Sequence, residues 1–202
     1  MKTTITRLYD SYHDASRALT ALRGAGIAHE DISIVAHNGD GTTVARVAET
    51  SEAGTGAGAG AGIGGALGGG AGLLAGLGML AIPGIGPVVA AGWLAATAAG
   101  AAAGAATGGI IGALTGSGVK DEEAHVYAES VRRGGALVTV RVESGRVAEA
   151  TAILDRHGPV DPGTRASVYR ERGWTRFDER ADPYTAEQIA RERALWENRP
   201  GV

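Results

Sequence analysis

Few side chains in this chain have the spacing that chemistry requires. Its five histidines are scattered, whereas a zinc site needs several ligands at close, regular spacing. We therefore expect them at surface or helix-cap positions and predict no metal site. The histidines are His13, His29, His37, His125 and His157.

The other patterns that resemble active-site motifs lack the context that their chemistry needs. Gly60, Gly62 and Gly65 match G-x-G-x-x-G, but a dinucleotide site also requires a preceding strand and an acidic residue about 20 residues further on. The run Asp121-Glu122-Glu123 suits the acidic first turn of a helix better than an acid/base pair. The sequence has no phosphate-binding loop with the motif Gly-Lys-Ser/Thr. Its serine, histidine and aspartate residues also show no spacing that identifies a catalytic triad. We predict no catalytic, cofactor-binding or metal-binding residues, and hence a protein that is not an enzyme.

Composition narrows the function further. The 202 residues include 19 basic and 22 acidic side chains, and a net charge of −3 gives no support to nucleic-acid binding. Cysteine is absent, which excludes disulfides and thiolate chemistry. No apolar signal core follows Met1, so we expect both termini in the cytoplasm.

The elements upstream of the glycine-rich stretch are a strand over 3–9, a helix and a strand over 31–36. Ser11 and Asp14 form a capping-box-like pair at the start of the helix, and Gly24 and Gly26 end it. The expected inner face of this helix carries residues at 3, 4 and 7 spacing. These are Ala15, Ala18, Leu19 and Leu22.

Downstream of the stretch, we predict a helix over 121–133, a strand over 136–143, a helix over about 145–157 and a last short strand over 164–169. The resulting order suits a ferredoxin-like α+β sandwich, a four-stranded antiparallel sheet covered on one face by helices. Neither half has enough apolar residues for its own core. The prediction is thus one split domain of residues 1–52 and 120–172.

A polar tail covers residues 173–202. Thr185 and Gln188 resemble a capping box that starts a helix over about 186–197. The apolar side chains of the tail are exposed unless it docks, either as a clasp across its own domain or as a strap onto a neighbouring subunit. We favour the clasp. The side chains in question are Trp174, Phe177, Tyr184, Ile189 and Trp196.

No charged residue occurs between Ala53 and Val119, and this stretch predicts a helical hairpin. Its bend is Pro83, Gly84, Gly86 and Pro87 with the intervening isoleucine. Small residues recur at every fourth position of both arms, which lets another helix backbone approach closely. We predict that this stripe is the interface of a homo-oligomer. It comprises Gly56, Gly60, Gly64, Gly68, Gly72, Gly76, Gly92, Ala96, Gly100, Gly104, Gly108, Gly112 and Gly116.

The medium around this hairpin is open between lipid and protein. Each arm would span roughly 45 Å at about 1.5 Å per residue, more than the hydrocarbon core of about 30 Å. We favour insertion in the cytoplasmic membrane, with a soluble cytoplasmic particle or filament as the alternative. The outer parts of the arms are mainly Gly and Ala, whereas the strongly apolar residues cluster near the bend. We therefore expect the tip of the hairpin to enter lipid or to pack inside the particle. The strongly apolar residues include Leu73, Leu77, Leu80, Ile82, Val88, Trp93 and Leu94.

Residues outside the stretch resemble a known family. The pattern Leu8-Tyr9-Asp10, Asp14-Ala15, Ala18, Leu22, Gly26-Ile27 and 31–36 resembles the bacterial general stress protein 17M-like domain, also called the heat-induced stress protein YflT domain. Glu122 to Tyr127, Arg132 to Gly135 and Leu137 to Val140 resemble the second half of longer members, which carry a Gly-rich insert. The resemblance implies a stress-associated, non-enzymatic protein and supplies no catalytic residues. A ligand-sensing regulatory domain is a further alternative, on fold analogy alone.

Overall fold

The computed structural model describes residues 2–38, 78–97 and 109–197. The strands are β1 (Lys2–Tyr9), β2 (Ile32–His37), β3 (Gly78–Ile82), β4 (Gly86–Ala91) and β5 (Ala136–Glu143). The helices are α1 (Tyr12–Gly24), α5 (Gly109–Gly116), α6 (Asp121–Arg132), α7 (Val147–Asp155), α8 (Pro162–Glu171) and α9 (Ala186–Glu197). Short 3-10 turns cover His29–Asp31 and Ser144–Arg146, and residues 93–97 are helical.

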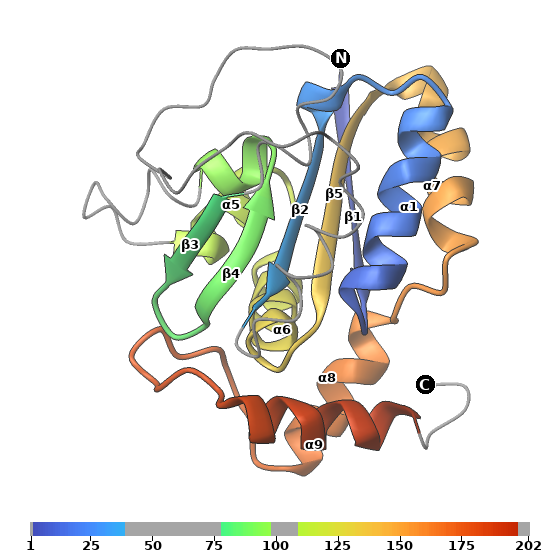
Figure 1. The fold of residues 1–202 in the computed structure, drawn as a ribbon. Helices are drawn as coiled ribbons and strands as arrows, with labels where there is room; N and C mark the ends of the chain where they lie inside the picture. Colours follow the sequence, from blue (N-terminus) through green and yellow to red (C-terminus); the bar gives the residue numbers. More distant parts are fainter. Residues whose placement is uncertain (1, 39–77, 98–108, 198–202) are drawn as a thin grey trace, which may run out of the picture.

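All five strands form one antiparallel sheet in the order β1-β5-β2-β4-β3. β5 lies between β1 and β2, with Ile5 opposite Val140 on one side and Ile32 opposite Val140 on the other. β1 and β2 are therefore joined through α1 as a split βαβ unit, and β3 with β4 extends the sheet beyond β2 (Figure 1).

Helices cover both faces of this sheet. On one face α1 and α7 pack side by side against Val138, Val140 and Val142 of β5 (Figure 1). On the other face α5 and α6 pack against Leu8, Val35 and Leu137. The alternation of side chains along β5 separates the two cores. The sequence predicted helices on one face only, and this part of the prediction is wrong.

Most of the local elements are confirmed by the structure. The predicted strand over 136–143 and the predicted helix over 186–197 have the same bounds as β5 and α9. Ser11 Oγ accepts a hydrogen bond from the Asp14 backbone N–H, as expected for a capped helix. The coarse class, a mixed α and β fold with an antiparallel sheet, is confirmed, whereas the specific ferredoxin-like topology is not confirmed.

The predicted last strand over 164–169 is instead the helix α8. Asp161 caps it by accepting a hydrogen bond from the Thr164 backbone N–H at 2.7 Å, and Pro162 occupies its first turn. Proline is well suited to that position because its missing N–H is unpaired there in any case. Only Val160 reaches the sheet in this region, through a bridge to Leu8. The fourth strand of the expected sandwich is thus replaced.

The predicted helical hairpin is also wrong at its bend. Residues 78–91 form a β-hairpin, with Ile82 paired to Gly86 across the turn. Gly84 and Gly86 have φ of +73° and +96°, conformations that glycine adopts without strain. Val88 and Val89 favour a strand because they are β-branched. This β-hairpin lies within the predicted insert at 53–119 but belongs to the sheet of the domain.

The tail docks on its own chain, as the clasp interpretation predicted. It does not cross a sheet face but runs along the end of the sheet, where α9 lies next to α8 (Figure 1). Phe177 and Ile189 are buried. Thr185 and Gln188 make the reciprocal hydrogen bonds of a capping box, at 2.8 and 3.3 Å.

Candidate functional site

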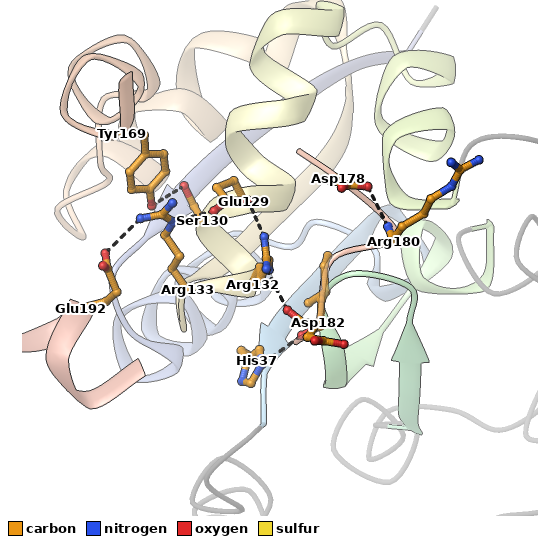
Figure 2. Close-up of polar contacts among 11 residues, drawn as sticks. His37, Glu129, Ser130, Arg132, Arg133, Tyr169, Asp178, Arg180, Asp182 and Glu192 are labelled. Carbon is orange, nitrogen blue, oxygen red and sulfur yellow. Dashed lines mark hydrogen bonds and ion pairs between the residues drawn. The ribbon is translucent and has the colours of Figure 1, made fainter. Parts of the chain in front are cut away.

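A group of charged and aromatic side chains, some of them buried, lies where the tail meets α6 and α8 (Figure 2). We call its domain side the cradle. Its members are Arg132, Arg133, Arg165, Tyr169 and Arg172, and they come from the end of α6, from α8 and from the residue after α8. The cradle does not resemble a catalytic site, because its members are four arginines and one tyrosine, with no nucleophile beside a base.

Glu129 organises the α6 side of the cradle. Its carboxylate is 1% exposed and accepts from Arg133 Nε at 2.6 Å and from an Arg132 guanidinium nitrogen at 3.5 Å. Burial alone would lower the pKa of Arg133, but the charge and hydrogen bond of Glu129 outweigh it and hold that pKa above its usual value. Arg133 is therefore a permanent buried cation with a fixed orientation.

Tyr169 and Arg165 form the α8 side of the cradle. Arg133 lies 4.2 Å from the ring centre of Tyr169, and the Tyr169 hydroxyl donates to Ser130 Oγ at 3.2 Å (Figure 2). Arg165 is 2% exposed and pairs with Asp10 at 2.7 Å. Burial raises the pKa of Tyr169, so its hydroxyl stays protonated and acts as a donor.

The tail fills the cradle with the carboxylate of Glu192 and the ring of Trp196. Glu192 of α9 lies 3.5 Å from Arg133 and 3.1 Å from Arg172. Trp196 stacks on Arg165 at 3.5 Å from its guanidinium carbon and meets Tyr169 edge-on. Partly exposed ion pairs contribute about 0–1 kcal/mol each, and a cation on an aromatic ring about 0.5–2 kcal/mol. The docking is specific in geometry but modest in strength.

The turn of the β-hairpin holds the tail upstream of α9. A Cβ added at Gly84 would lie 2.6 Å from the Asp178 backbone oxygen, and one at Gly86 would lie 2.7 Å from Pro183 Cβ. The predicted bend residues therefore lie against residues 178–183 of the same chain. His37 supports this turn from β2, with Nε2 3.2 Å from the Ile85 backbone oxygen (Figure 2).

A second polar feature is a groove of about 650 Å³ beside α5 and α6. It is lined by Ile111, His125 and residues 175–180. Neither ring nitrogen of His125 has a hydrogen-bond partner, although Nε2 lies 3.7 Å from an Asp121 carboxylate oxygen. Burial first, and then Arg176, lower the pKa of His125. The sequence placed the histidines at the surface, and this is wrong for His37 and His125, which are both buried.

The structure describes only part of the predicted assembly stripe. Gly92 does not face outward, because a Cβ there would lie 2.7 Å from Ser33 Cα of β2 in its own sheet. Ala96, Gly112 and Gly116 are exposed. Outside the described residues lie Gly56, Gly60, Gly64, Gly68, Gly72, Gly76, Gly100, Gly104 and Gly108.

The apolar residues predicted for the hairpin tip lie in the chain's own core where they are described. Ile82, Val88 and Leu94 belong to the cluster beneath α5 and α6, and Trp93 packs against it. Leu73 and Leu77 lie outside the described residues, as does the side chain of Leu80. Within the ranges that the structure describes, no helix is long and apolar enough to span a bilayer. Those ranges also contain no group of three or more metal-ligating side chains.

Sequence patterns missed the cradle itself. Arg132 and Arg133 lie at the C-terminal end of α6, where the helix dipole favours cations, and this explains their position but not their contacts with the tail. Glu129 precedes Arg132 and Arg133 by three and four residues, a spacing that allows ion pairs on a helix but gives no sign of burial. The partner of Arg165, Asp10, lies far away in the sequence. The one available sign was the set of aromatic residues in the tail, which require a docking surface.

Comparison with known proteins gives one match. Residues 4–83 match the family model of the heat-induced stress protein YflT domain. None of the curated proteins and none of the solved structures compared with the chain matches it. The matched range runs from β1 through β3 to the first residue of the hairpin turn. Residues 4–83 are thus similar to the heat-induced stress protein YflT domain, the family named from the N-terminal residues.

Proposed function

We propose that this is a non-enzymatic, stress-associated protein that self-associates through the uncharged small-residue face of α5 and the Gly/Ala-rich sequence that precedes it. The YflT match supports the stress-associated role. Self-association is supported by the way α5 is mounted on the domain. It buries Ile110, Ala113 and Leu114 and leaves Gly112 and Gly116 exposed.

The orientation of α5 is the observation that carries this proposal. Gly112 and Gly116 are four residues apart on one face, and no atom lies within 4 Å of a Cβ built at Gly116. A helix face without side chains lets another backbone approach, so that dispersion and weak Cα–H contacts add up along it. The buried side chains of α5, Ile110, Ala113 and Leu114, hold the helix so that this glycine face points away from the core.

Protein is a better-supported partner than lipid for this face. The apolar side chains that a hairpin tip would place in a bilayer, Ile82, Val88 and Leu94, are used inside the domain. Inserting them in a bilayer would remove them from the core that they form with α5 and α6. We therefore propose contact between copies of the chain as the principal interaction, with association with the cytoplasmic membrane as an outcome that the test below separates.

The test is the size of the assembly in Gly112→Leu/Gly116→Leu, measured by light scattering after gel filtration without detergent. The leucines fill the close-approach face, and we expect the assembly to dissociate. Gly24→Leu is the matched control, because Gly24 is exposed on α1 and a Cβ there also meets nothing within 4 Å. Unchanged size in the double variant would refute the proposal. Recovery of the wild-type protein only in the detergent-extracted membrane fraction would favour lipid instead.

The His125 groove favours a second candidate function, the sensing of a small polar ligand. His125 offers two buried ring nitrogens without hydrogen-bond partners, and Arg176 and Arg180 line the same groove. A ligand with an anionic group and a hydrogen-bonding group would match them. A set of small carboxylates and phosphates tests this by thermal shift. A rise in melting temperature that is lost in His125→Ala supports binding at this groove, and no rise with any of them contradicts it.

A further inference from the structure

We propose that the cradle is an exchangeable docking site, and that in the assembled protein its occupant is α9 of a second copy of this chain. The inference rests on the proposed self-association only for bringing copies close together. It adds a second contact, independent of α5, in which the partner copy contributes Glu192 and Trp196.

The charge of the cradle defines what fits it. Of the four arginines of the domain side, those at 132 and 133 pair with Glu129 and the one at 165 pairs with Asp10. The fourth, Arg172, pairs with Glu192. The third carboxylate, Glu192, comes from α9. With α9 removed, the cradle keeps an excess of positive charge beside the ring of Tyr169. A helix that carries a carboxylate and, four positions later, an aromatic ring matches both the excess positive charge and the ring of Tyr169. In α9 these residues are Glu192 and Trp196.

The attachment of α9 allows it to reach a second cradle. Phe177 is buried in the core, and residues 178–185 contain neither helix nor strand. Eight residues extend to about 27 Å. The contacts along this stretch include those of Asp178 and Glu179 with Gly84 and of Pro183 with Gly86. Arg132 also donates to the Asp182 backbone oxygen at 2.7 Å and lies over the ring of Tyr184. A second copy can make the same contacts, so exchange requires no new complementarity.

The weakness of the docking makes exchange accessible. Of the side chains that the structure describes on α9, only Ile189 is fully buried, against Gly134, and the other contacts are ion pairs and ring contacts. Such contacts weaken as salt screens them. Self-association raises the local concentration of neighbouring tails, which favours docking between chains over release into solvent.

Complementary charge reversal tests the exchange in the full chain. Arg172→Glu gives a cradle that faces its own Glu192 with a like charge, and Glu192→Arg gives a tail that faces its own Arg172 with a like charge. When the two variants are mixed, each tail meets an opposite charge only on the other chain. The chain has no cysteine, so Leu195→Cys on α9 of the first variant and Ser167→Cys on α8 of the second accept a donor and an acceptor dye. Leu195 and Ser167 are both exposed.

We expect energy transfer in this mixture about tenfold above that of either variant mixed with itself, the effect of one ion-pair reversal of about 1.4 kcal/mol. Arg172→Glu/Glu192→Arg restores the pair within one chain and serves as the control, with transfer equal to that of the wild type. Equal transfer in all mixtures would overturn the proposal. If a reversed variant fails to fold, the same dyes on wild-type chains give the answer. Transfer that rises after a high-salt pulse and dialysis supports exchange, and transfer that stays at zero refutes it.

The same mixtures in the Gly112→Leu/Gly116→Leu background separate this proposal from the proposed function. Loss of the large assembly with retained transfer between dilute chains shows that α9 exchanges without the α5 contact. If energy transfer is absent both in this background and in the mixture with intact α5, the exchange of α9 is refuted. The proposed self-association is not affected by that result, because the assembly size is measured separately.

Discussion

Replacement of Gly92 by alanine distinguishes a glycine of the fold from a glycine of an interface. Gly92 has φ of +90°, where a non-glycine residue is strained by about 1–3 kcal/mol. The added Cβ would also fall on the Ile32 backbone oxygen and 2.7 Å from Ser33 Cα. Backbone cannot rotate away as a side chain can, so relief requires β4 to move from β2, and such overpacking costs about 1–3 kcal/mol.

The two effects together predict a loss of about 4 kcal/mol in the free energy of unfolding. For a chain of this length, that loss lowers the melting temperature by roughly 12 °C. The matched substitution is Gly116→Ala, at the same four-residue phase of the sequence. Its Cβ meets nothing within 4 Å, and alanine is favoured over glycine in a helix by up to about 1 kcal/mol.

Thermal unfolding followed by circular dichroism, with urea unfolding as a second measure, checks the pair. We expect Gly92→Ala to melt well below the wild type and Gly116→Ala to melt with it or slightly above. If Gly92 acted as an interface glycine, its alanine variant would keep the melting temperature of the dissociated chain and change only the assembly size. Equal melting of both variants would refute the structural role assigned to Gly92.

Three further substitutions test the buried polar groups. Burial lowers the pKa of His125 in the folded chain, so the unfolded chain binds this proton more readily. Stability therefore falls as the pH drops below about 6.5. His125→Gln should flatten that part of the pH profile of the melting temperature. Glu129→Gln removes the buried partner of two arginines and should cost about 3 kcal/mol in urea unfolding, whereas Glu149→Gln at an exposed pair should cause no measurable change. Tyr169→Phe loses the hydrogen bond to Ser130 and should cost about 1 kcal/mol, seen as a small drop in melting temperature.

Local periodicity was sufficient to predict the elements whose faces are clearly divided. Val138, Val140 and Val142 alternate along β5, and the structure buries them on one face of the sheet. Thr185 and Gln188 started a helix at the predicted residue because the capping box is a contact within one turn. In both cases the interactions that decide the structure lie within a few residues along the chain.

The wrong predictions arise where two local signals disagree and the tertiary structure decides between them. The four-residue repeat of small residues favoured a helix through Gly92, but Val88 and Val89 favour a strand and β2 offered an edge to pair with. Similarly, Val168 and Tyr169 suggested a last strand, while Asp161 and Pro162 capped a helix that buries both of those side chains. Propensity is a weak prior when pairing partners lie far along the chain.

The sheet order explains why neither the family match nor the sequence halves define the folding unit. The matched range 4–83 contains β1, β2 and β3, yet no two of these strands are neighbours. β5 separates β1 from β2, and β4 separates β2 from β3. Every hydrogen-bonded ladder of the sheet therefore joins the matched range to residues beyond it or, between β3 and β4, crosses its end.

The same topology makes the tail part of the fold's stability rather than an appendage. The β3–β4 turn that ends the matched range is covered by residues 178–183, and α9 continues from there to the end of α6. The last segment of the chain thus bridges the two strands added to the sheet and the helix that precedes β5. A tail released from the cradle would uncover both, so exchange of α9 between copies and stability of the β-hairpin are expected to respond together to salt.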